Sequence, residues 1–203
     1  MAEPARVAIL LSGRGSNFLA LHGAMTRHEL PAEVALVVSN VAGAPGLEKA
    51  RALRLPTVCF PHEHEPAREA HERKVLTALE NAGVEWICLA GYMRLLSPSF
   101  VGVFPERILN IHPSLLPAFP GLDAQQQAVD WGVQVSGCTV HLVDEELDHG
   151  PIVLQRTVPV QHDDNALSLS ARILVEEHKA YPRALKRLLT ERWSVEGRRV
   201  VFR

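Results

Sequence analysis

The chain has 203 residues, 47% of them hydrophobic and 22% charged, and its formal net charge is −2. This composition is ordinary for a globular protein, and the near-neutral charge argues against nucleic acid as a partner. The first apolar run, 7–11, is far shorter than the roughly 20 residues of a membrane-spanning helix and lacks a cleavage site. We therefore expect a cytoplasmic protein with no membrane partner.

Short apolar runs alternate with longer amphipathic segments through the first half of the chain. They predict strands at 7–11, 34–38, 57–60 and 86–89, separated by helices at 17–27, 45–53 and 66–82. Such alternation is typical of an α/β fold with an open, mostly parallel twisted sheet and helices on both faces, which is a Rossmann-like arrangement. Pro45 suits a first helical turn, and Ser16 or Asn17 can cap the first helix.

The second half is less regular. Its patterns predict strands at 108–111, 136–143 and 151–160, helices at 125–131 and 166–190, and a terminal hairpin at 193–202. Pro113, Pro117 and Pro120 exclude regular structure directly after the first of these strands. No internal repeat or linker interrupts the chain, so a single domain over 1–203 is the simplest organisation.

A glycine-bearing loop, SGRGSN at 12–17, joins the first strand to the first helix. In an open parallel sheet this turn lies at the carboxyl end of a strand, where ligands bind. Glycines let the backbone approach a phosphate, and the start of a helix favours negative charge. The loop favours a monophosphate site, with a purely structural turn as the open alternative.

A nicotinamide cofactor is disfavoured at the same loop. Gly13 and Gly15 could open a dinucleotide motif, but Phe18 stands where the third glycine is needed. The second strand ends in Ser39 and Asn40 in place of the acidic residue that would bind a ribose. We therefore expect no NAD.

Asn110 and His112 lie two positions apart on a predicted strand, so their side chains share one face. An amide and an imidazole side by side can hydrogen-bond one carbonyl oxygen, which acyl transfer requires as an oxyanion develops. Pro113 keeps the chain extended and so orients the ring. The alternative is structural, with an asparagine capping the loop and a histidine bonded to backbone.

An acidic loop at 144–148 supplies a candidate carboxylate. Transfer to an amine must move a proton from the attacking nitrogen to the leaving one, and a carboxylate beside an imidazole can relay that proton and raise the pKa of the ring. We choose Asp148, because Leu147 can anchor it and Gly150 begins the following turn. A solvated turn remains the open alternative.

Four motifs together resemble the formyltetrahydrofolate-using transferases. In chain order they are SGRGSN at 12–17, AGYMRLLS at 90–97, NIHPSLLP at 110–117 and DHGP at 148–151. The match spans nearly the whole chain and is most similar to the phosphoribosylglycinamide formyltransferase family of purine biosynthesis. The resemblance implies transfer of the formyl group of 10-formyltetrahydrofolate, a co-substrate, to the amine of glycinamide ribonucleotide, giving formylglycinamide ribonucleotide and tetrahydrofolate.

The resemblance also implies roles for individual residues. It matches the catalytic group to Asn110, His112 and Asp148. It matches contacts to the ribonucleotide to Gly15, Ser16, Asn17 and Glu177, and contacts to the folate to Arg68, Met93, Arg94, Leu95, Leu96, Asn110, Val143 and Asp144. Residues from about 1 to 100 would then form the phosphate-binding half, and residues from about 101 to 203 the folate-binding and catalytic half.

Three positions depart from the family pattern, namely Asp123, Gln125 and His149. They fall in loops near the folate, so they can change affinity without removing the chemistry. Other fates of the formyl group stay open, as in a hydrolase that releases formate or a transferase acting on initiator tRNA. The former carries an extra N-terminal domain and the latter an extra C-terminal one. A non-catalytic nucleotide-binding module is the alternative from another class.

The remaining signals are weak. His62, His64 and His71 lack a sensibly spaced fourth ligand, so we expect no metal. The three cysteines show no metal-like spacing and read as reduced thiols. His141 either supports the site or satisfies a buried strand, with equal weight. The chain could act as a monomer or a homodimer, with small molecules as its partners.

Overall fold

The computed structural model describes residues 3–62 and 67–203, and the chain divides into two compact units, 1–109 and 110–203. We call them the N-terminal unit and the C-terminal unit. His64 and the expected helix start at Pro66 lie outside the described residues.

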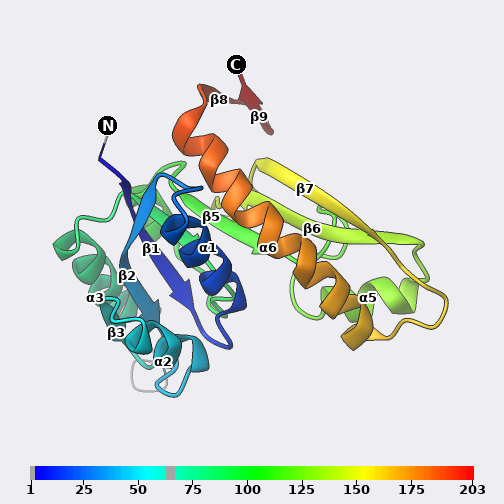
Figure 1. The fold of residues 1–203 in the computed structure, drawn as a ribbon, viewed down its shortest axis with the longest axis horizontal. Coiled ribbons are helices and arrows are strands. Elements are labelled where there is room, and N and C mark those ends of the chain that lie inside the picture. The colour runs from blue at the N-terminus through cyan, green and yellow to red at the C-terminus, as the bar shows by residue number, and fades with distance from the viewer. Residues whose placement is uncertain (1–2, 63–66) are drawn as a thin grey trace. The chain divides into compact units, whose positions relative to one another are not determined.

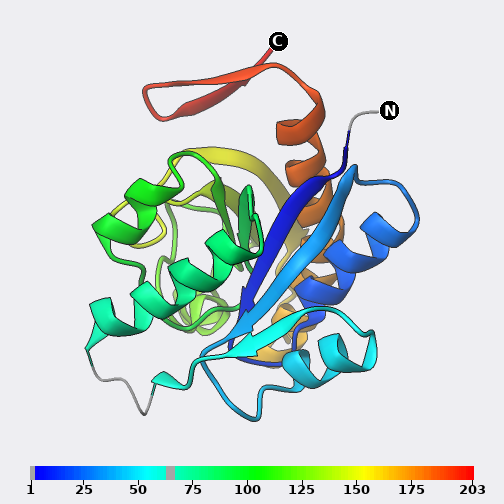
Figure 2. The same ribbon diagram turned by 90° about the vertical axis from the view of Figure 1, so that its left-hand side faces the viewer.

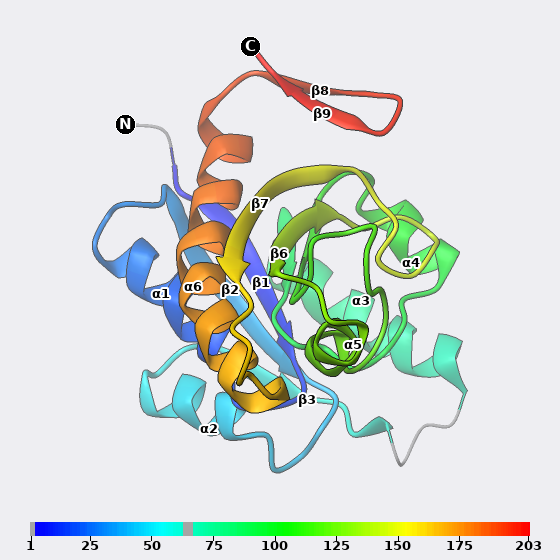
Figure 3. The ribbon, with the colours of Figure 1, turned by 90° about the vertical axis from the view of Figure 1, so that its right-hand side faces the viewer.

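The N-terminal unit is a parallel sheet flanked by helices. Its strands are β1 (Ala5–Leu11), β2 (Ala32–Ser39), β3 (Thr57–Cys59) and β4 (Trp86–Leu89), and its helices are α1 (Ser16–Thr26), α2 (Pro45–Ala52), α3 (Arg68–Asn81) and α4 (Pro98–Val103). The strand order is β3-β2-β1-β4, and each neighbouring pair is parallel. Figures 2 and 3 show α1 and α2 on one face of these strands and α3 on the other.

The core of this unit follows from that layering. The residues of β1 from Val7 to Leu11 are 0% exposed, because helices cover both faces of the strand. Fully burying a valine, leucine or isoleucine contributes on the order of 1.5–3 kcal/mol relative to leaving it exposed. The continuous apolar run at 7–11 is therefore the expected sequence of a central strand, and its carboxyl end leads into the SGRGSN loop.

Strand β5 (Ile108–His112) begins in the last two residues of the N-terminal unit and continues into the C-terminal unit. The C-terminal unit continues with α5 (Ala124–Trp131), β6 (Val135–Leu142), β7 (Ile152–Pro159), α6 (Ala166–Thr190), β8 (Trp193–Glu196) and β9 (Arg199–Phe202). The strand order is β5-β6-β7-β9-β8, with β6 and β7 antiparallel and β8 and β9 forming the terminal hairpin. Figure 1 shows α6 running along β6 and β7.

Helix α6 is the longest element of the described chain. Asn165 caps its start, accepting hydrogen bonds from the backbone nitrogens of Leu167 (2.9 Å) and Ser168 (3.1 Å), while Ser168 Oγ accepts from Asn165 N in return. This reciprocal capping box satisfies donors that the first turn otherwise leaves unpaired. In the described part of the chain, α6 included, no helix is both long and apolar enough to cross a membrane.

The expected α/β class with a mostly parallel sheet is confirmed, and Pro45 does begin α2. Capping of the first helix by Ser16 or Asn17 is wrong. Gly15 is the N-cap and both residues lie inside the first turn, so neither side chain can fold back on the cap. Helix α4 was not expected; its signal is Ser97 followed by Pro98, because Ser97 Oγ accepts from Phe100 N at 3.1 Å.

Candidate active site

Asn110, His112 and Asp148 meet in the C-terminal unit. Asn110 and His112 lie on β5, and Asp148 lies in the loop between β6 and β7. Asn110 Nδ2 donates to Asp148 Oδ1 at 3.3 Å, and His112 Nδ1 lies 3.2 Å from Asp148 Oδ2. The strand's two-residue period therefore turns both side chains to one face, where a single carboxylate contacts both.

Asp148 is held in an unusual backbone conformation. Its φ is 50°, in the left-handed region that residues other than glycine rarely adopt. Gly121 N donates to Oδ2 at 2.8 Å. Burial acts to raise the pKa of Asp148, but the neighbouring His141, the hydrogen bond from Gly121 N and the charge of His112 outweigh it, so the pKa lies below its usual value. Asp148 is therefore an ionised acceptor at neutral pH.

His112 departs from one expectation. We expected the carboxylate to raise the pKa of the ring, but burial outweighs both the Phe119 carbonyl and Asp148, and the pKa is lowered. Nε2 nevertheless donates to Phe119 O at 2.8 Å, and Nδ1 faces Asp148. The resting ring holds its proton weakly, yet both of its nitrogens face oxygen acceptors that stabilise an imidazolium once it forms.

His141 belongs to this group, although its residue pattern left its role open. Its Nδ1 donates to Leu142 O at 2.9 Å, which leaves Nε2 to accept from Asn110 Nδ2 at 3.2 Å. The same Nε2 lies 3.7 Å from Asp148 Oδ1. His141 therefore fixes the Asn110 amide with its nitrogen toward Asp148. Its place on β6 brings His141 next to Asn110 of β5, and the alternating pattern of β6 alone does not predict that contact.

The loop that carries Asp148 depends on Gly150. A Cβ at this position would lie 1.9 Å from Leu142 O, far inside any real contact. The proline-rich segment after β5 is held from β6, because Thr139 Oγ1 donates to Ser114 O at 2.7 Å and accepts from Leu116 N at 3.0 Å. Two neighbouring loops are thus both positioned by β6 and the turn that follows it.

The SGRGSN loop in the N-terminal unit is shaped by glycine contacts. Gly15 has a φ of 71°, and a Cβ on it would lie 2.7 Å from Gly46 Cα. Gly46 N donates to Gly13 O at 2.9 Å, so the start of α2 packs directly on the loop. No side-chain hydrogen bond caps α1, and the start of a helix favours negative charge.

Ser12 connects this loop to the segment after β4, a link that the motifs did not indicate. Its Oγ donates to Asn40 Oδ1 at 2.5 Å and accepts from Met93 N at 2.8 Å. Ser12 N also donates to Gly91 O at 3.0 Å. The Ser12 hydroxyl therefore links the loop of the phosphate-binding candidates at 15–17 to the segment of folate-binding candidates at 93–96, which we call the folate wall.

The remaining candidates divide between the two units. Met93 and Leu95 are 66% and 56% exposed, which suits an apolar ligand surface. Arg94 and Leu96 alternate with them along the chain and are half-buried, and Arg68 is the first residue of α3. Val143, Asp144 and the buried Glu177 of α6 belong to the C-terminal unit.

The loop that carries Asp144 contacts the terminal hairpin through His149. His149 Nδ1 donates to Asp144 Oδ2 at 2.8 Å, and Arg198 Nη1 donates to His149 Nε2 at 2.6 Å. Arg198 Nη2 also bonds the carbonyl of His149. The departure at position 149 from the family pattern thus brings a contact of its own.

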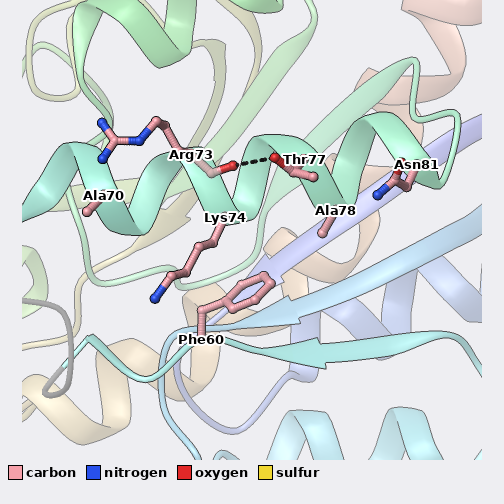
Figure 4. A pocket seen from close by; sticks show the side chains of 7 residues that line it. All are labelled: Phe60, Ala70, Arg73, Lys74, Thr77, Ala78 and Asn81. Atoms are coloured by element: carbon pink, nitrogen blue, oxygen red, sulfur yellow. Dashed lines mark hydrogen bonds between the residues drawn. The ribbon is translucent and has the colours of Figure 1, made fainter.

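Other signals show no site. Within residues 3–62 and 67–203, no three histidine, cysteine or acidic residues are grouped to hold a metal. His62 Nδ1 donates to Asn40 O and His71 Nε2 to Phe60 O. A hollow of about 510 Å³ on α3 is lined by Phe60, Ala70, Arg73, Lys74, Thr77, Ala78 and Asn81. Figure 4 shows Arg73 and Lys74 pointing to different sides, so the two cations do not converge on one anion.

The sequence and fold of this chain are similar to those of known proteins. Residues 5–185 match the family described as formyl transferase. The phosphoribosylglycinamide formyltransferase of Escherichia coli (strain K12) is 38% identical over 192 residues, covering 95% of this chain and 88% of the relative. The trifunctional purine biosynthetic protein adenosine-3 of Drosophila pseudoobscura pseudoobscura is 48% identical over 89% of this chain, which spans only 13% of that protein.

Solved structures agree with the sequence matches. Glycinamide ribonucleotide transformylase 1 from Symbiobacterium toebii superposes with a TM-score of 0.96 at 44% identity, covering 100% of this chain and 95% of that one. A formyltetrahydrofolate deformylase from Pseudomonas syringae pv. tomato has a TM-score of 0.90 at 28% identity, covering 99% of this chain and 66% of the other.

Proposed function

This chain belongs to the formyl transferase family, and on that premise we propose that it transfers the formyl group of 10-formyltetrahydrofolate to the amine of glycinamide ribonucleotide. The products are formylglycinamide ribonucleotide and tetrahydrofolate. Support comes from relatives of similar length that carry the name phosphoribosylglycinamide formyltransferase, such as the one from Bacillus subtilis (strain 168), with 40% identity over 91% of this chain.

The observation that carries the proposal is the convergence of Asn110, His112 and Asp148. The substrate amine attacks the formyl carbon, and the bond from that carbon to N10 of the folate breaks. When the substrate binds, Asn110 exchanges its hydrogen bond to His141, and a protonated His112 its hydrogen bond to Phe119 O, for hydrogen bonds to the formyl oxygen as negative charge develops. The developing oxyanion raises the pKa of a ring whose burial otherwise lowers it. The ring takes this proton from solvent water as the charge appears and returns it to water when the oxyanion collapses, so the proton balance of the transfer is unchanged.

Asp148 organises the proton transfer. The attacking nitrogen must lose a proton and N10 must gain one, so the reaction needs an ionised acceptor close to both. Asp148 carries a lowered pKa and contacts both other members of the group. It accepts the proton, through water, and returns it to the leaving nitrogen.

The substrates are held by the residues already located. Gly15, Ser16 and Asn17 bind the phosphate of the ribonucleotide, and Glu177 accepts from its ribose hydroxyls. The folate lies against Met93, Arg94, Leu95, Leu96, Asn110, Val143 and Asp144, with Arg68 near its glutamate tail. Cys59, Cys88 and Cys138 form no disulfide, which is consistent with a cytosolic location.

A transfer assay with both substrates tests the proposal. Formylglycinamide ribonucleotide should form only when glycinamide ribonucleotide and 10-formyltetrahydrofolate are both present. A parallel reaction without acceptor measures formate release, the activity named for the Pseudomonas syringae pv. tomato structure. Formate release at the same rate with and without acceptor would reject transfer in favour of hydrolysis, and no turnover in either reaction would reject both.

A further inference from the structure

Glu72 is a buried carboxylate that none of the matched motifs includes. It lies on α3 and is 4% exposed, although acidic side chains are rarely buried without partners. Ser97 N donates to its Oε1 at 2.8 Å, and Ser97 Oγ donates to its Oε2. Both carboxylate oxygens therefore accept from Ser97, the N-cap residue of α4.

Ser97 lies at the C-terminal end of the segment that carries the folate-binding candidates at 93–96. It follows Leu96 directly, and Ser97 Oγ also accepts from Phe100 N, which starts α4. The other end of this segment is held at Met93 N by Ser12 Oγ, at 2.8 Å. The segment 93–97 is thus fixed at both ends, and Glu72 is the support at its C-terminal end.

The same carboxylate holds Arg68. Arg68 Nε lies 3.3 Å from Glu72 Oε1, one helical turn away, and the Arg68 side chain is 41% exposed. The two terminal nitrogens of the guanidinium are not part of this contact, and together they can bind another carboxylate. Glu72 therefore restricts Arg68 while leaving the end of its side chain able to meet an acidic ligand.

We propose that Glu72 is a positioning residue of the folate site, which orients Arg68 toward the glutamate tail and fixes the wall segment 93–97 through Ser97. The proposal rests on the proposed function, because it takes the ligand to be a folate. Glu72 contacts no reacting atom and acts only through Arg68 and Ser97. A role confined to attaching α3 to α4 would affect stability alone.

The test uses two ligands that differ only in the tail. Calorimetry measures the dissociation constants of tetrahydrofolate and of tetrahydropteroate, which lacks the glutamate. The variants are Glu72→Gln, Glu72→Ala and Arg68→Ala, with Glu69→Gln as the matched control on the exposed side of the same turn. Binding needs no acceptor, so its outcome is independent of whether the wild-type protein transfers a formyl group.

Glu72→Gln keeps an oxygen for Ser97 N, and its new amide can donate to Ser97 Oγ in place of the bond that Ser97 Oγ now donates. The variant removes the charge that holds Arg68. We expect about fivefold weaker binding of tetrahydrofolate, the size expected for loss of one partly exposed ion pair, and unchanged binding of tetrahydropteroate. Glu72→Ala also leaves Ser97 N without its acceptor, so both ligands should bind more weakly. The control should match the wild type.

The double variant with Arg68→Ala completes the test. If Glu72 acts on the tail through Arg68, Glu72→Gln adds no further loss of tetrahydrofolate binding once Arg68 is gone. Equal effects of Glu72→Gln on both ligands, tighter binding of tetrahydrofolate, or a lowered Tm with both affinities unchanged would each overturn the proposal. An Arg68→Ala variant with no tail-dependent loss would overturn it as well.

Discussion

The two candidate regions, the SGRGSN loop and the Asn110–His112–Asp148 group, are built by opposite means. The loop presents backbone groups, and its shape depends on the absence of a side chain at Gly15. A Cβ added there would lie 2.7 Å from Gly46 Cα. The catalytic candidates present side chains, and each contacts another member of the group within 3.3 Å. Substitutions that preserve shape should therefore spare the loop and damage the side-chain group, whereas a Cβ added at Gly15 should damage the loop and leave the side-chain group in place.

The largest effect is expected at Asp148. Asp148→Asn keeps the size of the side chain but cannot accept a proton, so kcat should fall by about a thousandfold, within the range of general acid–base catalysis. Circular dichroism should show an unchanged fold. Asp130→Asn, at an exposed acid of the same unit, is the matched control and should retain full turnover. A kcat for Asp148→Asn within threefold of wild type contradicts its assigned role.

The loop should respond to Gly15→Ala with a different signature. The new Cβ meets backbone at Gly46 and the φ of 71° is strained for alanine, so we expect a loss of about 2 kcal/mol of stability and a higher KM for the ribonucleotide. Denaturant unfolding and initial rates measure the two effects. Gly43→Ala is the control, because a Cβ there meets nothing within 4 Å. Equal stability of both variants would refute the close-packing account.

Acid should weaken the side-chain region through His112. Its pKa is lowered by burial, so the unfolded chain, with an ordinary value near 6.5, binds the proton more readily than the folded one. The stability contributed by the neutral ring is present above about pH 6.5 and is lost as pH falls toward the lowered folded value. The slope is at most about 1.4 kcal/mol per pH unit. Urea unfolding at several pH values should show a smaller loss for His112→Gln.

The smallest effect is expected at the contact between the terminal hairpin and the loop that carries Asp144 and His149, which we call the folate loop. Arg198→Ala removes the donor to His149 and should raise the KM for 10-formyltetrahydrofolate about twofold, because the contact is exposed. Turnover at saturating folate should not change. Arg203→Ala removes another exposed pair of the hairpin and serves as the control. A fall in kcat without a change in KM would exclude a role limited to the folate loop.

Much of the fold could be predicted because the relevant signals are local. The apolar run of β1 and the periodic pattern of α6 matched the observed elements to within two residues. Helix α4 was missed because its six residues, which begin with Pro98, are too few to show a helical period. The cap of α1 was misassigned because a glycine with positive φ occupies the position where a polar side chain was expected.

The sequence predicted the members of the candidate site better than it predicted the residues that position them. Asn110 and His112 could be placed together by strand periodicity, and the four motifs indicated Asp148. His141, Ser12 and Glu72 contact partners that lie 31, 81 and 25 residues away in the chain, namely Asn110, Met93 and Ser97. Such partners become visible only when distant segments are brought together.

From its sequence alone this chain determines an α/β class, the order of its strands and helices, and the residue types of a formyl-transfer site, because each of these depends on neighbours within a few positions. Tertiary structure decided the lowered pKa of His112 and the buried support of Glu72. Both follow from burial, a property of the packed chain that no local pattern of residues contains.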